Sequence, residues 1–159
     1  MTKPLIFLLI GSLFFGFIEH STGQNIPDQQ KSRIEQQVDS VFHHMIREAE
    51  RLEYDQLSQG VDDKYHAGFI VNGSYYAQYD SLISSVKARS QGISNQSITI
   101  RRQKITVLSD HIVLLSAYGD TKAEAKDGNA FSIRFFWSFV YEKTGNEWKV
   151  IQSHQSSIR

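Results

Sequence analysis

The sequence predicts an α+β fold in which helical segments come first and an antiparallel sheet follows. In the first half, apolar residues recur at steps of three and four, as on one face of a helix. The second half is rich in Val, Ile, Phe, Thr and Tyr, which favour strands, and short turn-forming sequences separate these runs. Helices followed by a meandering sheet are typical of α+β domains.

The composition indicates one globular domain without a strong charge preference. The chain has 159 residues, of which 40% are hydrophobic and 12% aromatic, enough to fill a single core. Seventeen basic and seventeen acidic residues cancel, so no broad field favours nucleic acid or an anionic membrane, and we expect neutral molecules or proteins as partners. Since the chain has no cysteine, disulfides, thiol nucleophiles and cysteine metal sites are excluded.

The first residues have the pattern of a cleaved signal peptide. A positive charge at Lys3 precedes an apolar run over 5–17, and small polar residues follow. The run is shorter than the roughly 20 residues that span a bilayer, although a membrane anchor is the alternative. We therefore expect a signal peptide over 1–23, a flexible leader over 24–31, a domain over 32–159 and a secreted or periplasmic protein.

Three helices are expected before the sheet. Ser32 begins an S-x-x-E sequence that can cap a helix start, with Asp28 as the rival cap. The apolar stripe of this first helix comprises Ile34, Val38, Val41, Met45, Ala49 and Leu52. A second helical piece over 54–59 should end at Gly60, and a third over 81–91, capped by Asp80, should end at Gly92.

The strands are separated by short turns. Asp62 and Asp63 are expected in a turn, where adjacent carboxylates point apart and serve as turn or capping groups more simply than as a catalytic pair. A short strand over 66–71 should end in a turn at Asn72-Gly73. The main strands are expected over 97–108, 111–123, 130–142 and 148–156.

The strand over 130–142 is apolar on both faces. Aromatic and aliphatic residues occupy its odd positions, and Phe136 and Val140 lie on the even side. Because helices can cover only one face of an antiparallel sheet, the other face is expected to join two copies into a symmetric dimer. The alternative is that the chain's own termini cover this face.

The end of the chain resembles a known family. Residues 138–141, the turn at Gly145 and the run over 148–156 are similar to the closing hairpin of the SnoaL-like branch of the nuclear transport factor 2-like superfamily. This resemblance implies three helices packed in a strongly curved antiparallel sheet, a cone-shaped cystatin-like roll with a pocket inside. It covers most of the domain and identifies a fold, which does not settle the chemistry.

The resemblance also implies which side chains face the pocket. The ligand-binding residues would be Arg134, Phe136, Ser138, Ser153 and Gln155. Their neighbours would form the dimer interface, namely Phe135, Trp137, Phe139, Tyr141 and His154, and Trp148 would lie on the same side as His154. A slip of one residue in the register would reverse these orientations.

The chemistry expected of the pocket is modest. By the resemblance, Gly68 and Ser138 stand where isomerases of this superfamily carry their carboxylates, which disfavours that mechanism. His66 would share a strand face with Gly68, so it is the candidate catalytic base, or else an ordinary surface residue. Arg134 is a candidate for binding a ligand carboxylate; otherwise it forms a salt bridge to a helix acid such as Glu48 or Glu50, or is simply exposed at a strand end. His43 and His44 diverge on their helix, so no metal site is expected, and no cofactor.

These observations favour a secreted or periplasmic domain that binds a small, partly apolar molecule. One alternative is a metal-independent acid-base enzyme, an isomerase, dehydratase or hydrolase, that uses the same pocket. The other is a dimeric assembly module whose functional surface is the sheet. The sequence does not identify the ligand.

Overall fold

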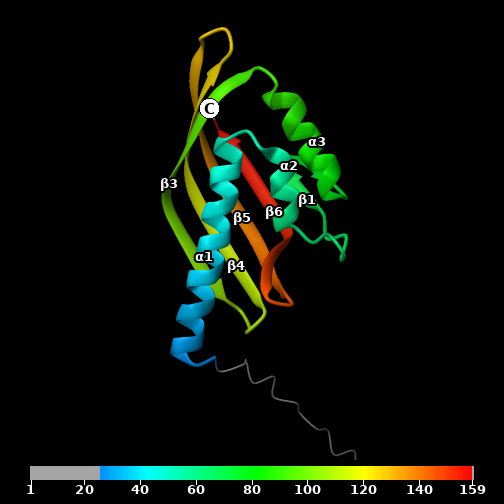
Figure 1. Cartoon of the computed structure of the whole chain (residues 1–159), viewed down its shortest axis with the longest axis vertical. Coiled ribbons are helices and arrows are strands. Elements are labelled where there is room, and N and C mark those ends of the chain that lie inside the picture. Colours follow the sequence, from blue (N-terminus) through cyan, green and yellow to red (C-terminus); the bar gives the residue numbers. More distant parts are fainter. Residues whose placement is uncertain (1–25, 159) are drawn as a thin grey trace, which may run out of the picture.

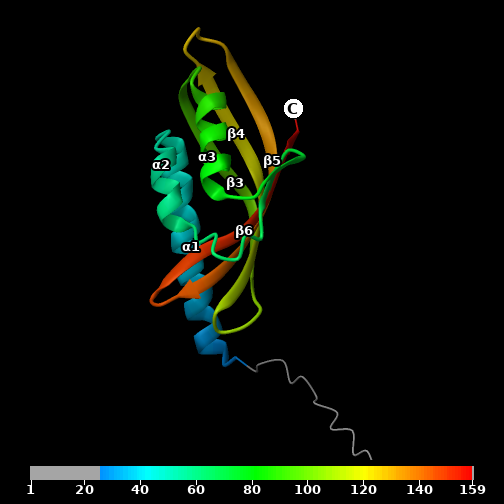
Figure 2. The ribbon, with the colours of Figure 1, turned by 90° about the vertical axis from the view of Figure 1, so that its right-hand side faces the viewer.

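The helices and the sheet form two layers. The computed structural model describes residues 26–158, so the predicted signal peptide over 1–23 lies outside the described residues. Figure 2 shows the three α-helices on one side of a curved sheet whose other side they leave uncovered. No described helix is long and apolar enough to cross a membrane. The expected α+β class, with three helices before a curved sheet, is confirmed.

The first helix, α1, spans Asp28–Glu50 and crosses the sheet diagonally (Figure 1). It begins at Asp28, directly after Pro27, rather than at Ser32 as predicted, because proline fixes a backbone angle suited to a helix start. No side chain caps this start. The expected stripe contributes Ile34 and Val38 to the core, and the structure adds Phe42 and Ile46 to it.

Short elements connect α1 to the main sheet. Helix α2 (Tyr54–Leu57) continues into the 3-10 turn η1 (Ser58–Gly60), as the sequence predicts. Strands β1 (Phe69–Val71) and β2 (Ser74–Tyr76) form a hairpin whose turn, Asn72-Gly73, has positive φ angles at both residues, as expected. Helix α3 spans Tyr79–Ser90.

Asp62 and Asp63 serve as turn and capping groups. Asp62 Oδ1 accepts a hydrogen bond of 3.2 Å from the backbone N–H of Lys64, which closes a local turn. Asp63 Oδ2 accepts one of 3.2 Å from the backbone N–H of Tyr79, the first residue of α3. Asp63, and not the expected Asp80, therefore caps this helix.

The sheet has six strands in the order β2-β1-β6-β5-β4-β3. The long strands are β3 (Ile93–Val107), β4 (Ile112–Ala125), β5 (Ala130–Thr144) and β6 (Glu147–Ile158). They pair antiparallel in sequence, as predicted, whereas β1 pairs parallel with β6. Helix α1 packs mainly over β3, at one edge of this sheet.

A glycine and a bulge bend the sheet around the helices. A register shift in β3 between Ile100 and Arg102 leaves Arg101 as an extra residue, and bulges increase the local bend and twist of a strand. Opposite, Gly119 of β4 lies so close to β3 that a Cβ atom there would be 2.0 Å from the carbonyl oxygen of Thr99. The absence of a side chain at Gly119 permits this close approach.

The orientation predicted for β5 is wrong. Phe135, Phe139 and Tyr141 are buried in the core beneath the helices, and Trp137 packs against them. Arg134, Phe136 and Ser138 consequently lie on the opposite, outer face. The odd face is the more completely apolar one, so burying it against the helices removes more hydrocarbon from water.

The orientation predicted for β6 is right at one end and wrong at the other. Tyr141 pairs with Val150, whereas the preceding Val140 pairs with Gln152, so Ile151 is the extra residue of a bulge. The bulge reverses the alternation. Trp148, expected at the interface, is therefore buried beneath α1, while Ser153 beyond the bulge also faces inward as expected.

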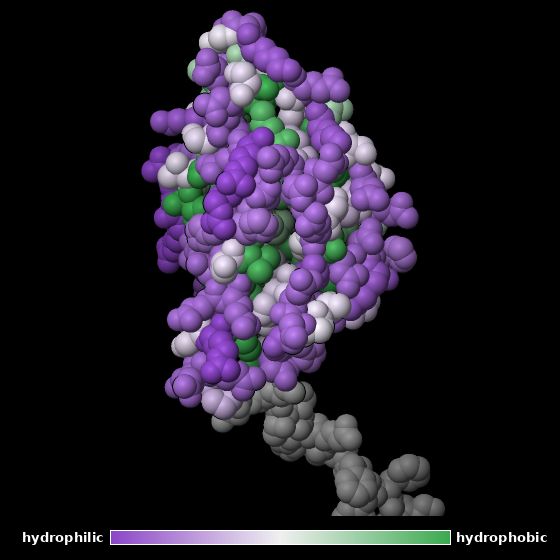
Figure 3. Space-filling model, viewed as in Figure 1, coloured by the Kyte–Doolittle hydropathy of each residue, from purple (hydrophilic) through white to green (hydrophobic). Residues whose placement is uncertain are grey.

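One core joins the two layers. Its largest fully buried side chains come from α1, α3 and four strands, and comprise Val38, Phe42, Phe69, Leu82, Val113, Leu115, Phe135, Tyr141 and Val150. Burying each such side chain stabilises the fold by roughly 1.5–3 kcal/mol. Seen as in Figure 1, the surface is mainly hydrophilic, with hydrophobic residues in separate small groups (Figure 3).

Candidate functional site

A small apolar cavity lies between α1, α3 and the sheet. Its volume is about 80 Å³, and it is lined by Phe42, Met45, Ile46, Ala49, Leu57, Tyr79, Trp137, Phe139, Val150, Ser153 and Gln155. Pockets for drug-sized ligands have volumes of roughly 300–1,000 Å³, so this cavity alone holds only a small group. Aromatic side chains from α1, α3 and β5 form much of its lining, namely Phe42, Tyr79, Trp137 and Phe139.

The cavity contains few polar groups. Ser153 Oγ accepts a hydrogen bond of 3.2 Å from Gln155 Nε2, and burial raises the pKa of the Tyr79 hydroxyl, so this group stays protonated. Among the described residues that line the cavity, none is Asp, Glu, His, Lys or Arg. The cavity can therefore donate and accept hydrogen bonds but holds no carboxylate or imidazole to abstract a proton.

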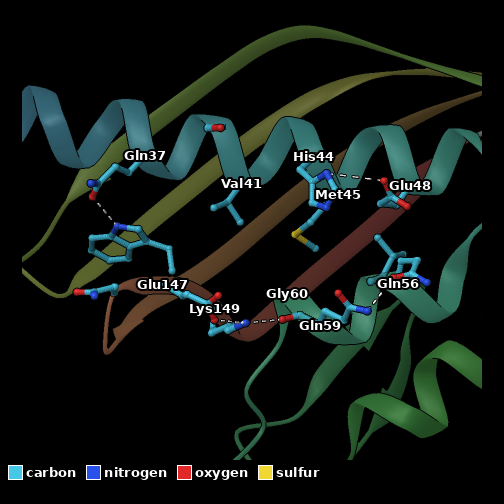
Figure 4. Close-up of a pocket in the computed structure, with 14 residues that line it drawn as sticks. Gln37, Val41, His44, Met45, Glu48, Gln56, Gln59, Gly60, Glu147 and Lys149 are labelled. Carbon is cyan, nitrogen blue, oxygen red and sulfur yellow. Dashed lines mark hydrogen bonds and ion pairs between the residues drawn. The ribbon is translucent and has the colours of Figure 1, made fainter.

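A larger cleft lies beside the cavity, between α1, η1 and the turn from β5 to β6 (Figure 4). Its volume is about 450 Å³, within the range of small-molecule sites. Met45 and Leu57 line both the cleft and the cavity. These two apolar side chains therefore form the wall between a polar outer space and an apolar inner one.

A histidine and a buried carboxylate face this cleft from α1. His44 Nδ1 lies 3.7 Å from Glu48 Oε1, and the same oxygen is 3.3 Å from Arg51 Nη1. Glu48 is only 5% exposed, whereas the His44 side chain is 65% exposed. A carboxylate in this position can orient an imidazole.

Amide side chains and a lysine form the rest of the polar rim. Lys149 Nζ donates a hydrogen bond of 2.6 Å to the backbone oxygen of Gln59 and lies 2.7 Å from Glu147 Oε2. The buried Trp148 donates its indole N–H over 3.0 Å to Gln37 Oε1. These contacts fix the β5–β6 turn against α1 and η1, so the mouth of the cleft is held by three elements.

The outer face of the sheet carries a shallow groove of about 430 Å³. It is lined by Arg102, Gln103, Lys104, Ser116, Ala117, Tyr118, Phe136, Trp137, Ser138, His154 and Ser156. The rings of Tyr118 and Phe136 stack at 6.1 Å and are 38% and 44% exposed. Exposed aromatic side chains on a sheet face are typical of surfaces that contact another molecule.

The predicted ligand-binding residues are divided between the two faces. Ser153 and Gln155 line the inner cavity, as expected. Phe136 and Ser138 line the outer groove together with His154, whose outward orientation was expected. Arg134 does not face the cavity either.

Arg134 forms a salt bridge on the outer face. Its Nε lies 3.3 Å from Asp120 Oδ1, and Arg101 contacts the other oxygen of the same carboxylate. The Arg101 guanidinium, together with that of Arg134, holds the pKa of Asp120 below its usual range. Arg134 thus forms a salt bridge, but its partner is Asp120 of β4 and not one of the predicted helix acids, Glu48 or Glu50.

His66 is not placed as a catalytic base. The strand expected over 66–71 begins only at Phe69, and His66 lies in the preceding loop, exposed, with a φ angle of 49°. Its backbone N–H donates a hydrogen bond of 2.8 Å to the Asp63 carbonyl. Because this turn rotates His66 away from the strand face of Gly68, its predicted inward orientation is wrong.

His44, Glu48 and Met45 are not among the site residues predicted from the sequence. The i, i+4 spacing of His44 and Glu48 on α1 places them on one helix face, and this signal was available. Among the described residues, no group of three or more His, Asp and Glu side chains is arranged to hold a metal ion.

Comparison with known proteins gives one family match and many structural ones. Residues 38–159 match the SnoaL-like domain. No curated protein sequence matches. A nuclear transport factor 2-like superfamily protein from Salmonella enterica superposes with a TM-score of 0.71 at 13% identity, covering 81% of this chain and 94% of that one.

Two further solved structures have names that suggest different activities. A candidate scytalone dehydratase from Novosphingobium aromaticivorans gives a TM-score of 0.75 at 6% identity over 84% of this chain and 89% of its own. A candidate calcium/calmodulin dependent protein kinase II association domain from Xanthomonas campestris gives 0.66 at 14% identity, over 76% and 85%. At these identities the likeness concerns the fold alone.

Proposed function

Because the chain belongs to the SnoaL-like domain family of the nuclear transport factor 2-like superfamily, we propose that it binds one small, partly apolar molecule between its helices and its sheet. The observation that carries this proposal is the cavity of about 80 Å³ that shares a wall with the cleft of about 450 Å³. An apolar group of the ligand would occupy the cavity, and its polar part would contact the rim of the cleft. Binding is favoured over catalysis because the described cavity lining contains no Asp, Glu, His or Lys side chain that could act as a general base.

Native mass spectrometry of the purified chain tests this proposal. We expect a co-purified molecule that is lost in Ala49→Leu, because Ala49 lines the cavity and a leucine there fills it. Gln36→Leu is the matched control, since Gln36 lies on the same helix, is exposed and lines neither space. A ligand retained by Ala49→Leu at unchanged stability would contradict binding in the cavity.

A second candidate function is acid-base catalysis in the cleft. It is supported by the 3.7 Å contact between His44 and the buried Glu48. In this alternative, His44 takes the role of catalytic base that was predicted for His66, in an isomerisation, dehydration or hydrolysis without a metal. A substrate screen with His44→Gln tests it, with His43→Gln as control because His43 does not line the cleft. Equal activity in both variants excludes His44 as the base.

The uncovered sheet face is proposed to join two copies of the chain. The stacked Tyr118 and Phe136 support this proposal, in place of the odd-numbered β5 residues first expected at the interface. Light scattering after size-exclusion chromatography should give a dimer that Phe136→Asp dissociates. Leu108→Asp, at an exposed apolar residue of the β3–β4 turn, should leave it intact. A monomeric wild-type chain would refute the proposal.

Export from the cytoplasm is also proposed, on the pattern of the first 23 residues alone. Mass spectrometry of the chain recovered from its producing cells measures the mature N-terminus. Cleavage after Gly23, giving Gln24 first, is the expected result. An intact Met1 on a cytoplasmic chain would contradict it.

A further inference from the structure

A buried tyrosine hydroxyl faces the wall between the cleft and the cavity. Tyr141 of β5 is fully buried, and its hydroxyl donates over 3.6 Å to Met45 Sδ. A thioether sulfur is a weak acceptor, so this donor has a poorer partner than a buried hydroxyl usually finds. Tyr141 itself lines neither space, so Met45 stands between them and a polar group whose hydrogen-bonding capacity is only partly used.

The methionine that contacts this hydroxyl also separates the two spaces. Met45 lines the cleft and the cavity, and its Cγ and Sδ lie 3.7 and 3.8 Å from the place where a Cβ of Gly60 would be. Its side chain therefore packs close to η1, at a distance that is ordinary for van der Waals contact. Because methionine is unbranched and has three rotatable side-chain bonds, it can change rotamer without moving α1.

The neighbouring Tyr79 adds a second hydroxyl at the same end. Tyr79 lines the cavity and is 7% exposed. Burial raises the pKa of both phenols, so each is a neutral donor at physiological pH. The inner end of the site thus offers donors and no charged acceptor.

We propose that a ligand carrying a carbonyl-type acceptor on an apolar body displaces the Met45 thioether and takes the hydrogen bond of the Tyr141 hydroxyl, which joins the cleft and the cavity into one pocket. This inference rests on the proposed function and names the class of ligand. The acceptor replaces a weak partner with a strong one, so Tyr141 selects ketones, amides or esters over hydrocarbons of the same shape.

A pair of probes that differ in one atom tests the selection. Acetophenone has a carbonyl oxygen where isopropenylbenzene has a methylene, and the two molecules are otherwise alike in shape. Binding of each is measured by NMR titration of the full chain. We expect Tyr141→Phe to weaken the binding of acetophenone by about three- to tenfold, which is the usual contribution of a neutral hydrogen bond. The affinity for isopropenylbenzene should stay within about twofold of the wild-type value.

Two further variants test the role of Met45. Met45→Ala removes the wall, so both probes should bind more tightly. Met45→Leu keeps the apolar bulk without the sulfur. Because leucine is branched and less able to change its conformation, this variant should bind both probes more weakly than wild type. Thermal unfolding of each variant checks that it is folded, and Met45→Leu provides a folded variant if Met45→Ala is too unstable.

The outcomes separate this inference from the proposed function. If wild type binds both probes and Tyr141→Phe affects them equally or not at all, the role of Tyr141 is refuted while the pocket stands. If Met45→Ala binds no more tightly than wild type, the displacement of Met45 is refuted. If neither wild type nor Met45→Ala binds either probe, the inference fails. Whether the chain binds a small molecule at all is then decided separately, by the native mass spectrometry of the co-purified ligand.

Discussion

Replacing Gly119 by alanine tests what bends the sheet around the helices. The added Cβ would lie 2.0 Å from the Thr99 carbonyl oxygen and 2.7 Å from Phe135 Cζ. Real Cβ atoms stay beyond about 3 Å from such neighbours, so β3 must retreat by about 1 Å or the buried Phe135 ring must leave its rotamer. Neither change is a small adjustment of a flexible side chain.

The expected loss is at the upper end of the range for overpacked sites. Overpacking costs roughly 1–3 kcal/mol, and retreat of β3 also weakens its ladder with β4, so we expect the free energy of unfolding to fall by about 3 kcal/mol. For a domain of this size, that lowers the melting temperature by roughly 10 °C. Urea unfolding followed by circular dichroism measures the free energy, and calorimetry measures the melting temperature.

A matched glycine gives the control. At Gly92 a Cβ would meet nothing within 4 Å, and its φ angle is outside the left-handed range. Gly92→Ala should therefore leave stability within about 0.5 kcal/mol or raise it slightly. If Gly119→Ala costs less than 1 kcal/mol, the adjacent bulge in β3 absorbs the clash and the glycine is not what permits the close approach.

Three further variants probe the cap, the core and the outer ion pair. Asp63→Ala removes the acceptor of the Tyr79 N–H, so urea unfolding should show a loss of about 1 kcal/mol, and an unchanged midpoint would exclude a capping role. Phe42→Ala empties a fully buried site and should cost about 3–5 kcal/mol; a loss under 1 kcal/mol would mean that the core refills the space. Arg101 holds the pKa of Asp120 below its ordinary 3.8, so the ionised carboxylate stabilises the fold above that pH and the contribution is lost as the pH falls through the lower folded value. Asp120→Asn should therefore be less stable than wild type at pH 7, and the difference in free energy of unfolding should disappear in acid titrations below pH 3.8. A difference that does not depend on pH would refute this role.

The fold was predictable because each level of the sequence agreed with it. The periodicity of α1, the turn at Asn72-Gly73 and the four long apolar strands all appear in the structure close to their expected bounds. Such agreement between local pattern and global architecture is what makes a fold predictable from one sequence. The structure begins α1 at Asp28 instead of the predicted Ser32, because a periodic pattern constrains the ends of a helix least.

The site was less predictable because β5 is apolar on both faces. The alternation itself favours burial of the odd positions, since Arg134 and Ser138 interrupt the even side. The family resemblance suggested the opposite orientation, and the residue pattern was the better guide. The placement of His66 depended on a backbone turn with positive φ, which the sequence does not mark because neither glycine nor asparagine stands there.

The bulge at Ile151 has a consequence for how this domain can change over time. Because Gln152 already pairs with Val140, deleting the unpaired Ile151 would restore a regular ladder and leave every later side chain of β6 on its present face. Ser153 and Gln155 would still line the cavity, and His154 would still face outward. A single lost codon at this position would thus straighten β6 without changing which residues line the cavity.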